Sequence, residues 1–513
     1  MQKLDFGTAG IRGILGKEPY QLNYFHVARV IDAYAQYAKA QYGKKASVVI
    51  GRDNRKMSCS FSKLAAYILD SYQIKVWYVK DIAATPFISY LTKIKKASGA
   101  INFTASHNPK NYNGIKLYNH FGAQCLPEEI NAIKKYFKDY EWYQTNFKLS
   151  QNINLAHLKN LNWTSKRDLN NYVTEVANLG INIIPNVKIA YSPLHGTGSK
   201  IMPLLLTKLG FTKVNNQFVN AFLSPEQMKI DRHFKTIDYP NPEYAEAYNY
   251  VKKLGLKHQA DLLLLSDPDS DRVGLSVWNG KEYVNLNGNE TALLIFYFLN
   301  QTNFYKNKND LFLVYSFVSS NLPSLIATKH NIKSIEVPTG FKWIAKIINE
   351  NKQNNFAFGF EESYGSLINS NIANDKDAFQ SIALIIKMAS YYKNQNLNLL
   401  YVLNSIYEEF GYVSSETLNF DINDNFNLNQ TIDKFINLNL KEEFNIEDYR
   451  NRNDFMKSQM IKLKFNDNSW IAMRPSGTEP KIKFYIFAFG QNENEANKKF
   501  NDFKIQISQL MNK

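Results

Sequence analysis

Short apolar runs rich in β-branched residues alternate along this chain with longer stretches whose apolar side chains recur at helical spacing. Helices of this length between strands act as crossover connections, which place the strands in parallel or mixed sheets. The pattern therefore predicts an α/β protein. It predicts strand and helix pairs at 47–51 with 61–71, at 187–191 with 201–209, and at 311–315 with 343–349.

The length of 513 residues corresponds to three or four domains. Candidate boundaries lie where the composition changes. The polar, Asn-rich stretch 150–162 is interpreted as a domain edge, residues 285–289 as the start of a further helical unit, and the low-complexity stretch 421–430 as the opening of the last domain.

The composition excludes several classes of protein. Hydrophobic residues make up 44% and charged residues 21%, which is typical of a soluble globular protein and excludes a disordered chain. No run reaches the roughly 18 apolar residues that a membrane helix needs, and the run 292–299 predicts a buried helix. Cys59 and Cys125 are the only cysteines. They exclude a disulfide framework and a cysteine-based zinc site, and they fit a reducing cytoplasm.

The net charge of +15 allows two interpretations. A basic surface can bind nucleic acid or an anionic small substrate. The lysines are scattered, however, and the chain has no long run of like charge, no zinc-finger spacing and no heptad repeat joined to a basic region. We therefore attribute most of the excess charge to amino-acid usage and expect neither nucleic acid nor a membrane as a partner.

Three carboxylates follow the apolar run 262–265 at alternate positions, as Asp267, Asp269 and Asp271. Alternate side chains of an extended backbone point the same way, so the three groups can converge, and they repel one another unless a cation is present. A site built from oxygen ligands alone suits Mg²⁺. A solvated acidic turn explains the bare pattern equally well. An EF-hand loop does not, because Arg272 stands where that loop needs glycine.

A serine follows the apolar run 100–103 within Thr104-Ala-Ser106-His107-Asn108-Pro109. A serine at a corner between a strand and a turn is expected to be exposed and can act as a nucleophile. An ordinary turn is the competing interpretation, since proline and polar residues mark turns in general. The chain has no GxSxG sequence here, so esterase chemistry has no support.

Two further stretches combine groups that bind phosphates or sugars. The stretch 474–481 contains an arginine, two hydroxyl side chains and a glycine, which together suit a phosphate cradle. The stretch 359–365 places two glutamates and a serine between glycines, where they can bind sugar hydroxyls. Each stretch alone is equally compatible with a surface turn.

The order of these stretches is more specific than any one of them. Together with Gly7-Thr8-Ala9-Gly10-Ile11-Arg12-Gly13 near the start, it resembles the α-D-phosphohexomutase family, the phosphoglucomutase/phosphomannomutase enzymes, over essentially the whole chain. The amino-acid sequences of 337–343 and 359–365 are similar to those of the phosphoglucomutase and phosphopentomutase-like branch. Mannose-type and glucosamine-type enzymes usually carry a different residue between the glutamate and the serine.

The resemblance implies four domains around a central cleft. Three are related mixed α/β sheet domains, and the smaller C-terminal domain is α+β. We expect the domains at 1–180, 181–286, 287–415 and 416–513, carrying in turn the phosphoserine loop, the metal loop, the sugar-binding loop and the phosphate-binding loop. The last domain is expected to move, because the reaction intermediate must turn within the site.

The resemblance also implies a mutase that moves a phosphoryl group between the 1- and 6-hydroxyls of a hexose. Ser106 would carry the phosphoryl group, a bisphosphorylated sugar would form, and glucose 1,6-bisphosphate would prime the enzyme. Glucose is the first expected sugar and mannose the second. A phosphopentomutase and a metal-dependent sugar phosphatase remain alternatives. The partner is a phosphosugar, and both a monomer and a dimer are compatible with the sequence.

The resemblance assigns roles to individual residues. Lys116 is the first candidate for the general acid/base, which would need a pKa lowered by the metal and the arginines, and His107 is the second. Arg12 and Arg272 would contact the transferring group. Mg²⁺ would be held by Asp267, Asp269, Asp271 and a phosphoryl oxygen on Ser106. The sugar would be held by Thr339, Glu361, Ser363 and Lys376, with Lys342 less certain, and the other phosphate by Arg474, Ser476, Gly477 and Thr478.

Overall fold

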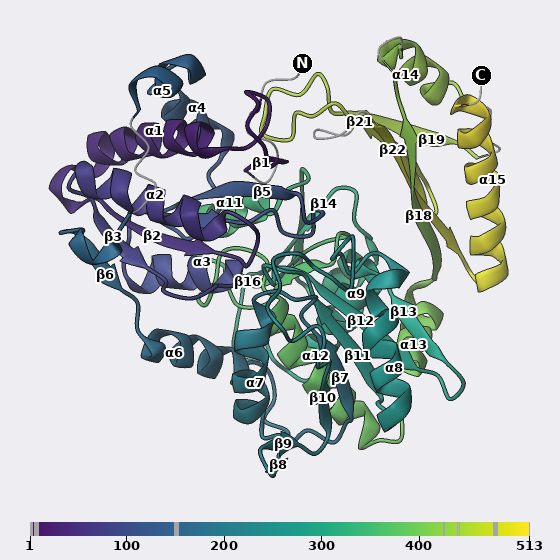
Figure 1. The fold of residues 1–513 in the computed structure, drawn as a ribbon. Helices are drawn as coiled ribbons and strands as arrows, with labels where there is room; N and C mark the ends of the chain where they lie inside the picture. Colours follow the sequence, from purple (N-terminus) through teal and green to yellow (C-terminus); the bar gives the residue numbers. More distant parts are fainter. Residues whose placement is uncertain are drawn as a thin grey trace.

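The computed structural model describes residues 4, 10–147, 153–423, 426–438, 440, 442–475 and 481–511. Within them the chain forms four principal sheets in succession, each with its own helices (Figure 1). The first three sheets mix parallel and antiparallel strands, and the fourth is wholly antiparallel. This confirms the prediction of three mixed α/β domains followed by a C-terminal domain of another type. Among the described residues, no helix combines the length and the apolar character that crossing a bilayer requires.

The first sheet has the strand order β1-β5-β4-β2-β3-β6. Val48 and Ile50 point to one face, where they join the core of α1 and α2, whereas Val49 points to the face covered by α3. This alternation is that of a strand buried on both sides. The strands are β1 (Ile11–Ile14), β2 (Ser47–Arg52), β3 (Lys75–Tyr78), β4 (Gly99–Phe103), β5 (Tyr112–Asn119) and β6 (Leu161–Trp163). The helices are α1 (Tyr24–Tyr42), α2 (Ser58–Ser71), α3 (Thr85–Ile94), α4 (Pro127–Lys134), α5 (Tyr140–Asn146) and, after β6, α6 (Lys166–Ala177).

The strand β6 pairs in parallel with β3. The end of the Asn-rich stretch 150–162 therefore adds an edge strand to the first sheet, and residues 150–152 lie outside the described residues. A polar composition marks exposed chain, and an edge strand such as β6 is exposed as well.

The second sheet has the order β10-β7-β11-β12-β13. Its strands are β7 (Ile189–Ser192), β10 (Ala221–Leu223), β11 (Leu262–Ser266), β12 (Val273–Trp278) and β13 (Tyr283–Leu286), with a separate ribbon of β8 (Lys213–Val214) and β9 (Gln217–Phe218). Helix α8 (Asn249–His258) packs on one face and α7 (Gly198–Leu209) on the other.

The third sheet has the order β15-β14-β16-β17. Its strands are β14 (Leu311–Ser316), β15 (Lys333–Val337), β16 (Asn355–Glu361) and β17 (Gly365–Leu367). Helix α11 (Phe341–Glu350) covers one face. The other face packs against α9 (Gly288–Gln301), α10 (Leu322–Lys329), α12 (Ala378–Lys393) and α13 (Leu399–Phe410). Helix α12 is buried nearly all round and contacts α6, α7, α9, β12 and β17, so it joins the first three units.

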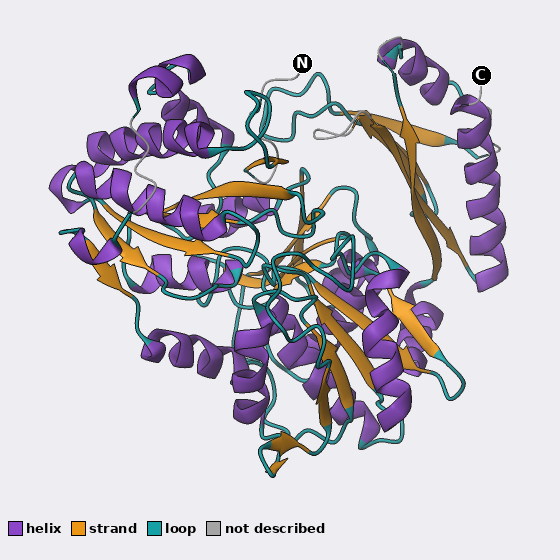
Figure 2. Ribbon diagram, in the orientation of Figure 1, coloured by secondary structure: helices purple, strands orange, loops and turns teal. Residues whose placement is uncertain are grey.

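The fourth sheet has the order β18-β22-β21-β20-β19 and stands beside the other three with α15 along its outer side (Figures 1 and 2). Ile471 and Met473 face the core of α14 and α15, whereas Trp470 and Ala472 face the core shared with the third unit. The elements are β18 (Tyr412–Asp421), α14 (Leu428–Ile436), β19 (Phe444–Asp448), β20 (Ile461–Phe465), β21 (Trp470–Pro475), β22 (Lys481–Gly490) and α15 (Glu493–Met511).

One arrangement recurs in the first three sheets. In each, a strand that is parallel to its neighbour on one side turns back into an antiparallel partner on the other. The turns are 104–111 between β4 and β5, 267–272 between β11 and β12, and 362–364 between β16 and β17. The first two turns contain the serine and the three aspartates, and the third contains Glu362 and Ser363 directly after Glu361, the last residue of β16. The three turns therefore occupy equivalent positions in three sheets.

Candidate active site

Ser106 lies on the first of these turns, directly after β4. Its φ of 50° is the left-handed conformation, and its N–H donates to Thr104 Oγ1 at 2.9 Å. Its Oγ donates to Asp267 Oδ2 in the turn of the second sheet at 2.6 Å. Ser106 is only 1% exposed. The expectation of an exposed serine is therefore wrong, because the aspartate loop of the second sheet closes over it.

Arg55 determines the shape of the serine loop. It is buried in the segment between β2 and α2, where its Nε lies 3.2 Å from Asp53 Oδ2. Five N–H donors on a rigid planar group let one arginine bind several carbonyls at once. The guanidinium donates to the carbonyls of Ser106 at 2.6 Å, Asn108 at 2.5 Å, Pro109 at 2.7 Å and Tyr112 at 3.2 Å.

The three aspartates converge as predicted. Asp267, Asp269 and Asp271 are buried and offer ligand oxygens that all lie within 4.8 Å of one another, the one such group found among the described residues. Asp267 Oδ1 accepts the N–H groups of Asp271 and Arg272, both at 3.0 Å. Because the group is buried and faces Ser106, the alternative of a solvated acidic turn is wrong.

Lys116 on β5 lies between two of these carboxylates. Its buried Nζ is 2.8 Å from Asp269 Oδ2 and 2.9 Å from Asp271 Oδ2. Burial lowers the pKa of Lys116, but the two carboxylates outweigh burial and raise this pKa above its ordinary value. The structure thus differs from the expected lowered pKa, because carboxylates rather than arginines are the nearest charges.

The aspartates themselves differ in their pKa. Burial raises the pKa of Asp267 well above its ordinary range, and Asp269 and Asp271 raise it further. For Asp271, burial also raises the pKa, but Lys116, Lys376 and Arg272 together lower it below the ordinary value. The three cationic neighbours of Asp271 thus favour its ionised form, whereas burial and the two acidic neighbours of Asp267 favour its neutral form.

The group fits a hard divalent cation. The Oδ1 atoms of Asp269 and Asp271 are buried without a hydrogen-bond partner. Buried carboxylate oxygens are costly to leave unpaired, so two of them in a cluster of three acids indicate room for a ligand that supplies positive charge. An all-oxygen donor set is the one that Mg²⁺ prefers.

Two arginines from different sheets flank the serine loop. Arg12 on β1 donates from Nη1 to Asn108 Oδ1 at 2.9 Å. Arg272 at the end of the aspartate loop donates from Nη1 to Glu243 Oε1 at 2.7 Å. The Nε atoms of both arginines are buried without a hydrogen-bond partner. Both guanidinium groups thus have N–H donors to offer an anion at the site.

His107 directly follows the serine, and its Nδ1 lies 3.2 Å from Ser106 Oγ. Burial lowers the pKa of His107 well below its ordinary value, and the charges of Arg272 and Arg12 lower it further. The imidazole is therefore neutral at neutral pH and can donate or accept one hydrogen bond at the serine, but it carries no charge.

The third sheet contributes Lys376 and Glu361. Lys376 Nζ lies 3.4 Å from Asp271 Oδ2 and 3.9 Å from Glu361 Oε2. A Cβ at Gly365 would lie 1.9 Å from Lys376 Cδ, so only glycine lets the lysine stem pass the hairpin. Glu361 Oε1 accepts the N–H of Gly340 at 2.7 Å. Ser363 lies half-buried in the same hairpin, and Lys342, in the first turn of α11, has its Nζ 5.7 Å from the ring centre of Trp343.

Arg474 brings the fourth sheet to the site. Its Nη1 donates to Thr339 Oγ1 in the third unit at 2.8 Å, and its Nε donates to Tyr485 OH at 3.2 Å. Thr339 lies directly before Gly340, whose N–H binds Glu361. The arginine therefore faces the third hairpin. Ser476, Gly477 and Thr478, which the sequence places in the same cradle, lie outside the described residues.

Sequence reasoning missed three residues that hold these groups in place: Arg55, Thr85 and Glu243. A signal existed for Arg55, since the charged Arg52-Asp-Asn-Arg55 follows a buried strand at the end where such sheets bind ligands. Thr85 precedes a proline at the start of a helix, which indicates a helix start but no partner. Glu243 carries no signal, because only the fold brings it to Arg272.

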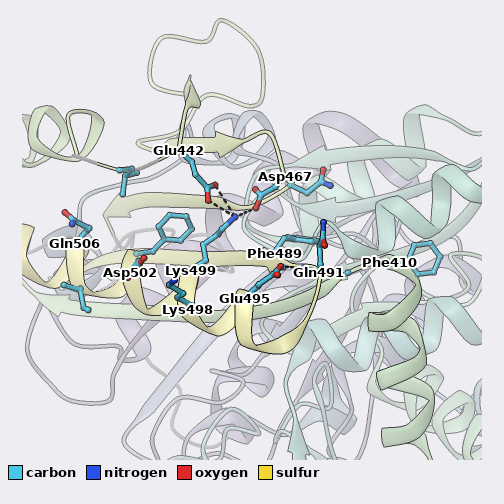
Figure 3. Close-up of a pocket in the computed structure, with 16 residues that line it drawn as sticks. Phe410, Glu442, Asp467, Phe489, Gln491, Glu495, Lys498, Lys499, Asp502 and Gln506 are labelled. Carbon is cyan, nitrogen blue, oxygen red and sulfur yellow. Dashed lines mark hydrogen bonds and ion pairs between the residues drawn. The ribbon is translucent and has the colours of Figure 1, made fainter.

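A pocket with a volume of about 730 Å³ lies away from Ser106, on the fourth sheet and α15 (Figure 3). Its central ammonium, Lys499, is already paired with Asp467 and with Glu442, the latter at 3.1 Å. None of the candidate site residues lines it. It is therefore separate from the site built around Ser106.

Four family models match successive parts of the chain. They are the phosphoglucomutase/phosphomannomutase alpha/beta/alpha domain I over residues 3–144, domain II over residues 170–280, domain III over residues 287–409, and the C-terminal domain over residues 435–499. The matches follow the order of the four sheets.

Whole-chain comparisons agree with these matches. A phosphoglucomutase from Staphylococcus aureus (strain bovine RF122 / ET3-1) is 33% identical over 527 aligned positions, which cover 97% of this chain and 92% of the relative. The open form of the phosphoglucomutase pp63/parafusin from Paramecium superposes with a TM-score of 0.75 at 19% identity, covering 99% of this chain and 95% of the other. A phosphoglucomutase/phosphomannomutase family protein from Burkholderia thailandensis gives a TM-score of 0.71 at 17% identity, covering 98% and 97%.

Proposed function

Because the chain belongs to the phosphoglucomutase/phosphomannomutase family and is a sugar-phosphate mutase, we propose that it interconverts glucose 1-phosphate and glucose 6-phosphate through a phosphoserine at Ser106. The observation that carries this proposal is the 2.6 Å contact of Ser106 Oγ with Asp267. It places a nucleophilic oxygen against the buried acidic group, with Lys116 on the same group.

In this proposal Asp267, Asp269, Asp271 and a phosphoryl oxygen on Ser106 hold Mg²⁺. When bound, the cation neutralises charge that builds up on the transferring phosphoryl group. The two buried carboxylate oxygens without a partner support this assignment. Arg12 and Arg272 bind the equatorial oxygens of the same phosphoryl group, since arginine presents several fixed donors to a phosphate.

Proton transfer belongs to Lys116 in this scheme. The sugar hydroxyl that attacks phosphoserine loses a proton, and the Oγ of Ser106 that leaves gains one. Lys116 is held protonated by its carboxylates, so it can supply its proton to the leaving oxygen. The neutral amine formed in that step can then take up the proton of the attacking hydroxyl. His107 is neutral and orients the serine oxygen through its Nδ1.

The sugar and its second phosphate are assigned to the last two units. Thr339, Glu361, Ser363 and Lys376 bind the sugar hydroxyls, and the loop that begins at Arg474 binds the phosphate that is not transferred. The bisphosphorylated sugar turns end over end between two transfers, and glucose 1,6-bisphosphate primes the serine. The contact between Arg474 and Thr339 supports this assignment, because it places the phosphate-binding side chain beside the sugar-binding loop.

A panel of sugar 1-phosphates tests the substrate. We expect the highest kcat/KM with glucose 1-phosphate, a lower value with mannose 1-phosphate, and the lowest with ribose, deoxyribose and glucosamine 1-phosphates, all with bisphosphate activator present. A preference for the pentose phosphates would replace this assignment with a phosphopentomutase. Release of inorganic phosphate at the rate of sugar-phosphate turnover would replace it with a phosphatase.

A further inference from the structure

Thr85 connects the first sheet to the aspartate loop of the second. It is the first residue of α3 and is fully buried. Its N–H donates to the carbonyl of Asp269 at 2.8 Å, and its Oγ1 donates to Asp269 Oδ2 at 2.7 Å. One residue of the first unit thus fixes both the backbone and the side chain of a candidate metal ligand in the second.

The direction of the hydroxyl bond follows from its other neighbours. Thr85 Oγ1 accepts from Asn102 Nδ2 at 3.0 Å and from Lys116 Nζ at 3.4 Å. A hydroxyl has one proton to donate and two lone pairs to accept with. Because two donors already point at Oγ1, its single proton is directed to Asp269.

The contact determines which oxygen of Asp269 is left for a ligand. Oδ2 accepts from both Thr85 and Lys116, whereas Oδ1 is buried and has no partner. The terminal torsion of an aspartate has a broad minimum, so a carboxylate keeps one orientation only when its surroundings hold it. Thr85 and Lys116 supply this constraint at Oδ2 and leave Oδ1 as the buried oxygen of Asp269 without a hydrogen-bond partner.

We propose that Thr85 is a positioning residue of the divalent-cation site, whose hydroxyl orients Asp269 for the cation. This rests on the proposed role of the three aspartates as metal ligands. Groups that hydrogen-bond a metal ligand commonly change metal affinity about 10- to 100-fold when they are removed. The hydroxyl of Thr85 has this relation to Asp269.

If the Thr85 hydroxyl served only the packing of α3, removal of another buried hydroxyl from this helix should have the same effect. Thr92 lies on the same helix and is also buried, but its hydroxyl donates to the carbonyl of Ile88 within the helix at 2.8 Å. The substitution Thr92→Val is therefore a matched control, because it removes a buried hydroxyl from α3 without touching the aspartates.

Binding of Mn²⁺ to the purified full chain, followed by the loss of the free-ion electron paramagnetic resonance signal, measures cation affinity without turnover. We expect Thr85→Val to weaken Mn²⁺ binding about tenfold, and Thr85→Ser, which keeps the hydroxyl, to stay within about threefold of wild type. Thr92→Val should bind Mn²⁺ as wild type does. In the mutase assay Thr85→Val should raise the Mg²⁺ concentration for half activation more than the KM for glucose 1-phosphate.

Two results would contradict the inference in different ways. If wild type binds Mn²⁺ and Thr85→Val binds it equally well, Thr85 does not position Asp269, and the proposed function is unaffected. If wild type and Asp269→Asn both fail to bind Mn²⁺, the metal site itself is wrong, and the proposed function loses its cation. Thermal unfolding in chelator confirms that each variant is folded, and Thr85→Ala replaces Thr85→Val if the valine variant is not.

Discussion

Ser106 shows how a single buried residue connects two sheets. Its hydroxyl proton is directed to Asp267, whose raised pKa reflects burial and two acidic neighbours. A cation bound at the three aspartates would favour the ionised form of Asp267, and an ionised carboxylate accepts the serine hydrogen bond more strongly. The same contact ties the serine of the first sheet to the acidic group of the second.

The substitution Ser106→Ala should abolish mutase turnover, because no other hydroxyl occupies this position. The fold should persist, since one unpaired carboxylate oxygen costs about 1–3 kcal/mol. Intact mass after incubation with glucose 1,6-bisphosphate should show one added phosphoryl group on wild type and none on the variant. Ser62→Ala, which removes a buried hydroxyl bound to Tyr78, is the control. Activity of Ser106→Ala within about tenfold of wild type would exclude Ser106 as the phosphoryl carrier.

At the scale of elements, the turns that carry Ser106, the three aspartates and Glu362 occupy the same position in their sheets. Each joins a strand with a parallel neighbour to an antiparallel partner, so each lies where the first of these strands ends. Side chains in these turns lie outside the hydrogen-bonded strand pairs, so their positions depend on the contacts that stabilise each turn. For the serine turn this is Arg55, whose guanidinium binds four backbone carbonyls.

The substitution Arg55→Lys should therefore distort the serine turn while leaving β4 and β5 intact. An ammonium has three donors and no planar fork, so at least one of the four carbonyls loses its partner. We expect kcat to fall roughly 10- to 100-fold with little change in KM, because small misplacement of a reacting group costs about this much. Amide hydrogen exchange should increase within 104–111. Arg52→Lys, where the arginine contacts the carbonyl of Lys80, should show neither effect.

The alternation of strands and helices could be predicted from the sequence because it depends on local patterns. The runs at 47–51, 187–191 and 311–315 correspond to β2, β7 and β14, and the acidic spacing of Asp267, Asp269 and Asp271 predicted their convergence. The burial of Ser106, the raised pKa of Lys116 and the role of Thr85 could not be predicted. Each depends on a contact between residues more than 150 positions apart, which only the folded chain brings together.

For the whole molecule, the described residues of the fourth sheet meet the third unit through the shared apolar core and through polar contacts. Lys462 on β20 is one of them. Its buried Nζ donates to the carbonyl of Phe317 at 2.8 Å, lies 3.6 Å from Glu336 Oε1, and stands 4.3 Å from the ring centre of Trp470. Burial lowers the pKa of Lys462, and Glu336 acts against that shift.

The substitution Lys462→Met should loosen the fourth sheet. It removes the donor to the Phe317 carbonyl and leaves Glu336 with the hydroxyl of Tyr315 alone, which costs about 1–3 kcal/mol. We expect a larger radius of gyration in small-angle X-ray scattering and a higher KM for glucose 1-phosphate. Lys464→Met on the same strand removes an exposed pair with Glu447 and should change neither quantity. Equal scattering curves for Lys462→Met and wild type would show that other contacts hold the sheet.

Arg474, near the end of β21, tests whether the four units act as one site. In the proposed reaction one serine serves both ends of the sugar, so one remote cradle would bind the second phosphate in both orientations. Arg474→Ala should therefore raise KM for glucose 1-phosphate and glucose 6-phosphate together. Loss of a charge-assisted phosphate contact of about 1.5–3 kcal/mol corresponds to roughly 10- to 100-fold in kcat/KM.

The same variant should release more free bisphosphorylated sugar per turnover, because the intermediate depends most on this cradle while it turns. Arg450→Ala, which removes an arginine paired with Asp448 on the same domain, should do neither. A defect confined to one direction of the reaction would instead make Arg474 a contact of one orientation only. A second phosphate-binding group would then be sought on the third unit, where Lys376 Nζ lies 3.9 Å from Glu361 Oε2.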